Sequence, residues 1–248
     1  MSTRRSEQER RVAATCLIVF ACFLLAVVLW NTIQYKLPTR YDLNAEFLDK
    51  ANASKSIGIF FCYLVVSSLG FAGVVGLVHT YGVNMGLFAE TVRLAATAYF
   101  ALNYWLWSAI WIVQHRITLL TETPTNPPDW LLRIFDASDA LWALAGWGSI
   151  PPGILFSGGV AWLLRRSSRL IPRLAAGMFA ALAALQLLWV IYSGLRGLQF
   201  FNVGGFTLPY LMDAAQALLQ ILAYLCAGVA LYREKGIFVR TARAGGRG

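Results

Sequence analysis

Residues 12–30 read VAATCLIVFACFLLAVVLW, a run without a single charged side chain. The hydrocarbon core of a membrane is about 30 Å thick, and about 20 residues of α-helix are needed to cross it. Backbone amides and carbonyls find no water at that depth, so a run of this length must satisfy them within a helix. The stretch therefore predicts a membrane-spanning helix.

Further apolar blocks repeat this pattern along the chain. Together they predict six spans, at residues 12–34, 57–79, 92–114, 140–164, 173–195 and 208–231. The composition agrees, because the 248 residues are 58% hydrophobic and only 13% charged, whereas a soluble domain carries about 25% charged residues. We expect an all-α, polytopic integral membrane bundle of six transmembrane helices that forms a single membrane domain over residues 1–248.

The net charge of +9 is also typical of nucleic-acid-binding proteins, but the positions of the basic residues indicate another role. Lysines and arginines concentrate in segments that six spans place on one side, at 1–11, 165–173 and 233–248. Cytoplasmic segments retain such an excess, and it attracts anionic lipid headgroups. We expect cytoplasmic N and C termini, and the lipid bilayer rather than nucleic acid as partner. The Ala/Leu/Arg-rich composition indicates a multi-pass protein of a bacterial inner membrane.

The fourth span contains an unusual stretch, GWGSIPPGIL at 146–155. Its two prolines have no N–H and cannot donate to the carbonyls four residues earlier. In hydrocarbon an unpaired carbonyl costs several kcal/mol, so a partner is expected: a nearby serine, a neighbouring helix, water or a ligand. We expect this helix to be broken or kinked near the bilayer midplane. The groups at the break are Trp147, Gly148, Ser149, Pro151 and Pro152.

Polar side chains recur at helical spacing along the sixth span, with further amides on the third and fifth. This set comprises Asp213, Gln216, Gln220, Tyr224, Asn103 and Gln186. Polar groups within a span face the bundle interior or a wet cavity, because facing lipid is costly. In one hypothesis Asp213 forms an ion pair with Arg196, and the amides hold the helices together. In the other, Asp213 carries a proton or cation, and the polar stripe lines its path towards the break.

Small residues at every fourth position predict places where helix backbones approach closely. These ladders are Ser68, Ala72 and Gly76, then Gly153, Ser157 and Ala161, then Ala176, Ala180 and Ala184. Each ladder can face another helix of this chain, a second copy, or a different membrane protein. On the third span, Tyr104, Trp107 and Trp111 share an aromatic face, and we expect Trp105 to turn towards lipid.

The sequence contains no recognisable catalytic or metal-binding motif. His79 and His115 lie at opposite ends of their spans, about 30 Å apart, so they cannot share a haem or a metal. The lysines lie outside the spans, which leaves no buried amine for a Schiff base. We therefore expect no cofactor and no bound metal.

The leading functional hypothesis is a non-enzymatic membrane subunit or interaction protein that acts through helix packing. It needs no catalytic residues, and its partner is a second membrane protein or a second copy. The rival hypothesis is a small-solute or proton-coupled transporter, with its site at the proline break and the polar stripe of the sixth span. A third hypothesis is a membrane enzyme that acts on a lipid or a quinone.

Overall fold

The computed structural model describes residues 2–34, 50–120, 129–194, 202–203 and 206–234. Its helices are α1 (Ser2–Gln34), α3 (Lys50–Tyr81), α4 (Gly86–Phe100), α5 (Trp107–Leu120), α6 (Asp129–Arg165), α7 (Leu170–Gly194) and α8 (Leu208–Arg233). A π-helix, η1 (Ala101–Leu106), joins α4 and α5 into one continuous rod. A short antiparallel pair, β1 (Asn202–Val203) and β2 (Phe206–Thr207), precedes α8. Apart from this pair, the turns at 82–85 and 166–169, and Glu234, the described part is helical, and each rod overlaps one predicted apolar block.

Several of these helices have the length and composition of membrane spans. Four segments are long and apolar enough to cross a membrane: Glu7–Leu29, Ile57–Tyr81, Leu170–Ile191 and Ala214–Arg233. Large apolar side chains on their outer faces are exposed, among them Leu25, Val65, Leu188 and Leu218. Contiguous apolar surface of this kind is rare on a soluble monomer and is expected where lipid is the solvent. The chain therefore has the character of a multi-pass membrane protein.

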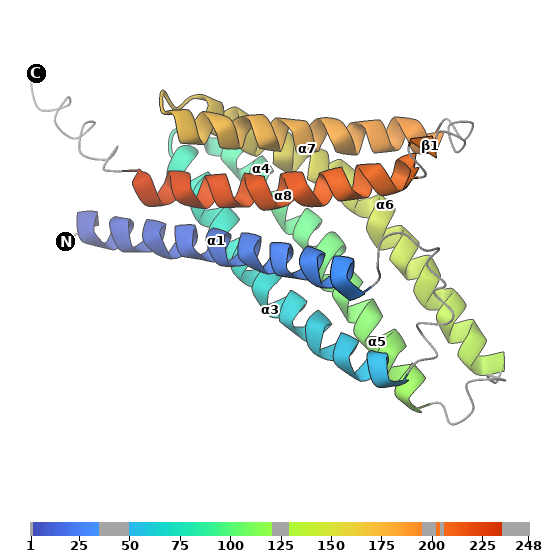
Figure 1. Cartoon of the computed structure of the whole chain (residues 1–248). Helices are drawn as coiled ribbons and strands as arrows, with labels where there is room; N and C mark the ends of the chain where they lie inside the picture. The colour runs from blue at the N-terminus through green and yellow to red at the C-terminus, as the bar shows by residue number, and fades with distance from the viewer. Residues whose placement is uncertain (1, 35–49, 121–128, 195–201, 204–205, 235–248) are drawn as a thin grey trace, which may run out of the picture.

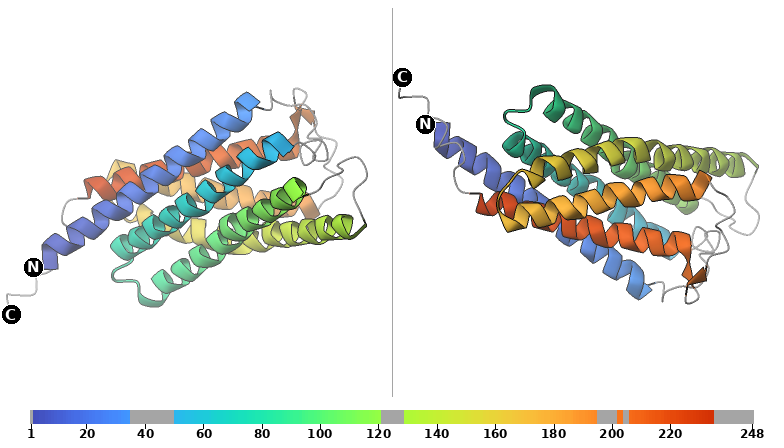
Figure 2. Two further views of the ribbon diagram at one scale, coloured as in Figure 1. Left: turned by 90° about the horizontal axis from the view of Figure 1, so that it is seen from below. Right: turned by 90° about the horizontal axis from the view of Figure 1, so that it is seen from above.

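The helices form a closed ring (Figures 1 and 2). Helix α1 packs between α3 and α8, α7 packs between α6 and α8, and the α4–η1–α5 rod lies between α3 and α6. The start of α1, the end of α8, and the turns at 82–85 and 166–169 all lie at one end (Figure 1). We call this the basic end. At the opposite end, α5 and the first half of α6 diverge from α7 and α8 (Figure 1).

Aromatic side chains fill the interior of the ring. Phe20 of α1 lies at the centre, with ring centroids 5.4 Å from Tyr104 and 5.0 Å from Tyr224. These rings are fully buried, as are Phe100, Phe156 and Phe179. Edge-on and tilted contacts of this kind stabilise a core beyond the area that they bury.

Glycines on α3 allow α1 to approach closely. A Cβ atom at Gly70 would lie 2.5 Å from Phe20, one at Gly73 would lie 2.7 Å from Leu17, and one at Gly76 would lie 2.3 Å from Ala13. The contact therefore uses every third residue of α3. Of the predicted ladder, Gly76 lies at this contact, whereas Ser68 and Ala72 are exposed, so their predicted contact with a second copy or another protein stays a prediction.

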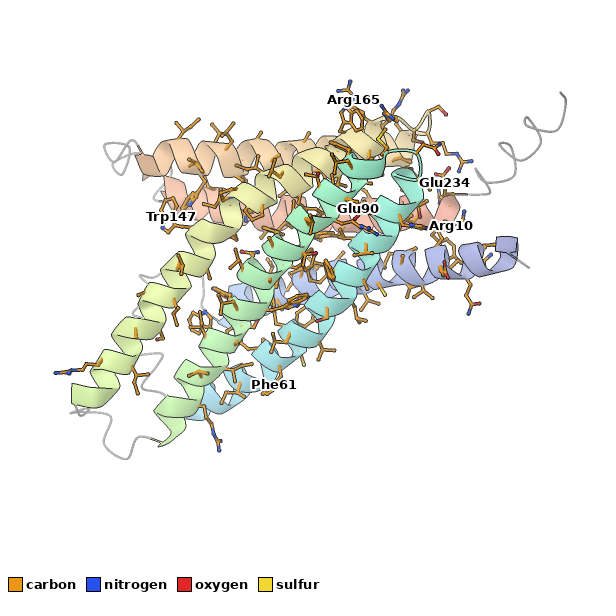
Figure 3. All side chains as sticks on the ribbon, turned by 180° about the vertical axis from the view of Figure 1, so that it is seen from behind. Arg10, Phe61, Glu90, Trp147, Arg165 and Glu234 are labelled. Atoms are coloured by element: carbon orange, nitrogen blue, oxygen red, sulfur yellow. The ribbon has the colours of Figure 1, made fainter. Side chains whose placement is uncertain are left out.

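Helix α6 runs from Asp129 to Arg165 without interruption and includes both prolines. Its axis bends just beyond Trp147 (Figure 3). The Ser149 hydroxyl donates a 2.8 Å hydrogen bond to the Gly146 carbonyl, which is not one of the carbonyls that the prolines leave without a donor. The expectation of a broken helix was therefore wrong, whereas a kinked helix agrees with the structure.

Candidate functional site

A buried tyrosine on α4 joins three segments across the interior of the ring. The hydroxyl of Tyr99 accepts a 2.7 Å hydrogen bond from Nε2 of Gln220 on α8 and a 3.2 Å bond from Nδ2 of Asn103 in η1. Tyr99 and Gln220 are both buried. A phenolic oxygen can accept two hydrogen bonds and still donate its own proton. Tyr99 thus accepts hydrogen bonds from α8 and from η1 at the same oxygen.

The amide of Gln186 on α7 lies beside Tyr99 and against the backbone of α6. A Cβ atom at Gly153 would lie 2.8 Å from Nε2 of Gln186 and 3.0 Å from Cδ2 of Tyr99. Gly153 directly follows Pro152, so both side chains contact α6 just past its prolines. Gln186 is 4% exposed, and its Oε1 has no hydrogen-bond partner. The structure therefore places an unsatisfied acceptor just past the bend of α6.

Further polar atoms in the third rod are buried without a partner. The Tyr104 hydroxyl is one of them, and its ring lies 5.8 Å from Tyr99 and 5.9 Å from Tyr63. Ser108 Oγ, one turn further along, and Trp105 Nε1 are two more in the described part of this rod. Buried polar groups are nearly always hydrogen-bonded to protein or water, and of the unpaired atoms those of Tyr104 and Gln186 belong to side chains that lie beside Tyr99. We call Tyr99, Asn103, Tyr104, Gln186 and Gln220 the Tyr99 cluster.

The π-helical segment η1 explains how this cluster forms. Residues five apart lie on one face of a π-helix, whereas in an α-helix they are about 140° apart. Tyr99 and Tyr104 can therefore both point inwards. Analysis by α-helical spacing missed Tyr99 for this reason, and the sequence signal that could have identified it is the pair of tyrosines five residues apart.

The predicted aromatic face of this rod is confirmed. Phe60 of α3 lies 5.4 Å from Trp107 and 5.3 Å from Trp111, and Tyr63 contacts both Tyr104 and Trp107. Trp105 differs from expectation, because its ring packs edge-on against Phe71 of α3 at 5.6 Å. It lies against a neighbouring helix instead of facing lipid.

The structure brings together some of the predicted site residues and separates others. Gln186, Gln220 and Asn103 converge on Tyr99, and the buried Tyr224 lies one turn beyond Gln220 on α8.

The remaining predicted residues lie around this group or apart from it. Ser149 is buried at the bend and Gln216 is half-buried, whereas Trp147 is 52% exposed. A Cβ atom at Gly148 would lie 3.5 Å from Leu102. The backbone of Asp213 belongs to α8, but its side chain and the whole of Arg196 lie outside the described residues, so their predicted ion pair remains a prediction.

The Tyr99 cluster contains only uncharged groups. Its members are two kinds of neutral side chain, phenols and primary amides. An ion without a counter-charge is costly to bury, so an arrangement of this kind favours an uncharged ligand with both donors and acceptors.

A second polar group, which sequence reasoning missed, lies at the basic end. Glu234 directly follows α8 and is 2% exposed. Its carboxylate accepts a 2.9 Å hydrogen bond from the Tyr81 hydroxyl at the end of α3 and lies 3.6 Å from Nη1 of Arg169. Arg169 also donates to the carbonyl of Arg233 at 3.1 Å. No local signal marked Glu234, because its partners are far away in the sequence.

Among the residues that the structure describes, no three His, Cys, Asp or Glu side chains come together in a group that could hold a metal ion. No protein-family model, curated protein or solved structure matches the chain.

Proposed function

We propose that this chain is a six-span membrane protein that carries a small, uncharged, hydrogen-bonding solute through the Tyr99 cluster. The observation that carries the proposal is the unpaired Oε1 of Gln186, buried beside Tyr99 just past the bend of α6. Bent or broken helices near the midplane are where secondary transporters place their substrates. In this proposal the α4–η1–α5 rod and α6 cross the membrane beside the four apolar helices, and the basic end faces the cytoplasm of a bacterial cell.

The chemistry of the cluster supports an uncharged solute. Gln186 offers an acceptor, and Tyr104 offers a hydroxyl that can donate or accept. A solute with one hydroxyl or amide group can satisfy both. Charged solutes would need a counter-charge that the described members of the cluster do not supply.

The arrangement of the helices supports transport of a solute across the membrane in preference to simple binding of a ligand. At the basic end, Tyr81 and Arg169 hold the ring together through Glu234, whereas at the other end α5 and α6 diverge from α7 and α8 (Figure 1). Alternating access requires two such ends that open in turn around a central site.

A second candidate function is a membrane subunit that packs against a partner. It is favoured by the outer face of α7, where Gly177, Ala180 and Ala184 are exposed and no helix of this chain covers them in the described part. A stable partner, or a second copy, that co-purifies in mild detergent would support this candidate; a chain that purifies alone would contradict it.

The carrier proposal is tested by reconstituting the full chain into liposomes and following entry of glycerol and of urea by light scattering. We expect glycerol and urea to enter faster than they enter protein-free liposomes. Potassium should enter no faster than it does without the protein. Gln186→Leu should abolish the gain, because it removes the unpaired acceptor. The matched control is Gln216→Leu on α8. Gln216 is half-buried, and this variant should still let both solutes enter faster than they enter protein-free liposomes. Uptake no faster than in protein-free liposomes, or uptake unchanged in Gln186→Leu, would overturn the proposal.

A further inference from the structure

The turn between α6 and α7 carries a dense group of arginines at the basic end. Arg165, Arg166, Arg169 and Arg173 lie within nine residues of sequence, and all four are exposed. Figure 3 shows Arg165 extending outwards from this end of the bundle. Such a concentration of like charge requires counter-ions.

The carboxylates of this end are largely committed elsewhere. Glu7 pairs with Arg11, Glu90 with Arg93 and Glu234 with Arg169. Within the described residues, Arg165, Arg166 and Arg173 make no ion pair with a carboxylate. The sequence from 235 to 248 contains no Asp or Glu, so that segment supplies none either. Three guanidinium groups are thus available to an external anion.

Two of these groups are held in place by the fold. The Arg166 guanidinium lies 4.0 Å above the ring of Trp162, and its Nη1 lies 3.6 Å from Sδ of Met85 in the turn before α4. Trp162 in turn packs on Phe88 at 4.5 Å. A cation held over an aromatic face keeps most of its N–H donors free. Arg173 is oriented separately, because its Nε donates a 3.0 Å hydrogen bond to the Ser167 carbonyl.

Exposed apolar side chains lie close in sequence to the arginines and to Met85, which Arg166 contacts. Leu87 and Phe88 lie in the first turn of α4, just after Met85, and Leu170, which directly follows Arg169, begins α7; Leu87 is 84% and Leu170 72% exposed. A site for a free inorganic anion has no need of apolar groups at its edge. Cationic groups with exposed apolar side chains near them in the chain instead match an amphiphile with an anionic head and a hydrocarbon tail.

We propose that Arg165, Arg166 and Arg173 bind the phosphate headgroup of an anionic phospholipid, whose acyl chains lie against Leu87 and Leu170. Guanidinium groups bind phosphate oxygens through paired N–H donors. The site rests on the membrane location of the chain and is independent of the solute site, with which it shares no residue. It gives the turn between α6 and α7 a ligand of its own.

The test uses the full chain in a neutral detergent, with lipid binding titrated by native mass spectrometry and by thermal unfolding. The probes are phosphatidylglycerol, which is anionic, phosphatidylcholine, which is zwitterionic, and inorganic phosphate. We expect phosphatidylglycerol to bind and to raise the melting temperature, and the other two to have little effect. The double variant Arg165→Gln/Arg166→Gln should bind phosphatidylglycerol about thirtyfold more weakly, since each arginine near the surface contributes about fivefold.

The matched control is Arg116→Gln/Arg133→Gln, which removes two exposed arginines at the opposite end and should leave the affinity unchanged. Equal affinity in the two double variants would overturn the proposal, as would equal binding of phosphatidylcholine. A full effect of inorganic phosphate would assign the arginines to a free anion and overturn the lipid site. If the first double variant does not fold, Trp162→Leu keeps every charge and should still weaken binding severalfold; unchanged affinity there would count against the site.

Discussion

The Tyr81 hydroxyl donates a hydrogen bond of 2.9 Å to the carboxylate of Glu234, 153 residues further along the chain. Arg169 lies 3.6 Å from the same carboxylate. One buried side chain therefore links the end of α3, the end of α8 and the turn that leads into α7. These three elements hold the basic end of the ring together.

Removing the Tyr81 hydroxyl should weaken this link. Tyr81→Phe leaves the ring in place but takes away a hydrogen bond to a buried charge, and we expect a loss of about 2 kcal/mol in the free energy of unfolding. The measurement is an unfolding titration in mixed micelles. Tyr232→Phe on α8 is the control, because Tyr232 is 58% exposed and should tolerate the change. Equal stability of the two variants would show that the link contributes nothing.

Loss of the hydrogen bond between Gln220 and Tyr99 should lower the free energy of unfolding by less than Tyr81→Phe does. Gln220→Leu leaves the Tyr99 oxygen with Asn103 as its remaining donor. Interhelical hydrogen bonds in membranes contribute about 0.6–2 kcal/mol, so a loss of about 1 kcal/mol is expected in the same titration. Gln216→Leu, four residues earlier on the same helix, should cost less than half as much. A larger loss of stability in Gln216→Leu than in Gln220→Leu would mean that the polar stripe of α8 does not face Tyr99.

The close approach of α1 and α3 makes one glycine far more sensitive than another. Gly70→Ala places a methyl group 2.5 Å from the Phe20 ring, and overpacking of this kind costs about 1–3 kcal/mol. Gly58→Ala on the same helix meets no atom within 4 Å and should be neutral or slightly stabilising, because alanine favours helix over glycine. Melting temperatures of the two variants provide the comparison, and a similar decrease in both would contradict the packing.

The prolines should determine the bend of α6. Replacing Pro151 and Pro152 by alanine restores two N–H donors and removes two ring clashes, so the helix should straighten. Spin labels at positions 133 and 165, in a variant without the native cysteines, report this as a longer label-to-label distance. We also expect uptake of glycerol to decrease, because Gln186 packs against Gly153 just past the bend. An unchanged distance would assign the bend to packing by the neighbouring helices.

Six spans place the two ends of α6 on opposite sides of the membrane. Cysteines introduced at Arg133 and at Ser168, both exposed positions, should differ in their reaction with a membrane-impermeant thiol reagent applied to intact cells. Position 133 should react, whereas position 168 should react only after lysis. Labelling of both positions in intact cells would contradict the six-span topology.

The sequence predicted much of the fold, because the length of an apolar block and the spacing of 3.6 residues per turn are local properties. The inward face of α8 is an example, since Gln220 and Tyr224 are both buried as their spacing indicated. Tyr99 was missed because the spacing changes within η1. Glu234 was missed because its burial depends on Tyr81 and Arg169, which only the closed ring brings near it.

The short π-helix also sets what the third rod can tolerate. A change of side chain between Ala101 and Leu106 alters one contact, whereas deletion of one residue there would convert the segment to regular α-helix. Because a π-helical turn holds one residue more than an α-helical turn, residues downstream would keep their facing, and Trp107 and Trp111 would stay against Phe60. Insertion of one further residue would instead rotate everything downstream by about 100°. In this part of the chain, an insertion should therefore disturb the bundle more than a deletion does.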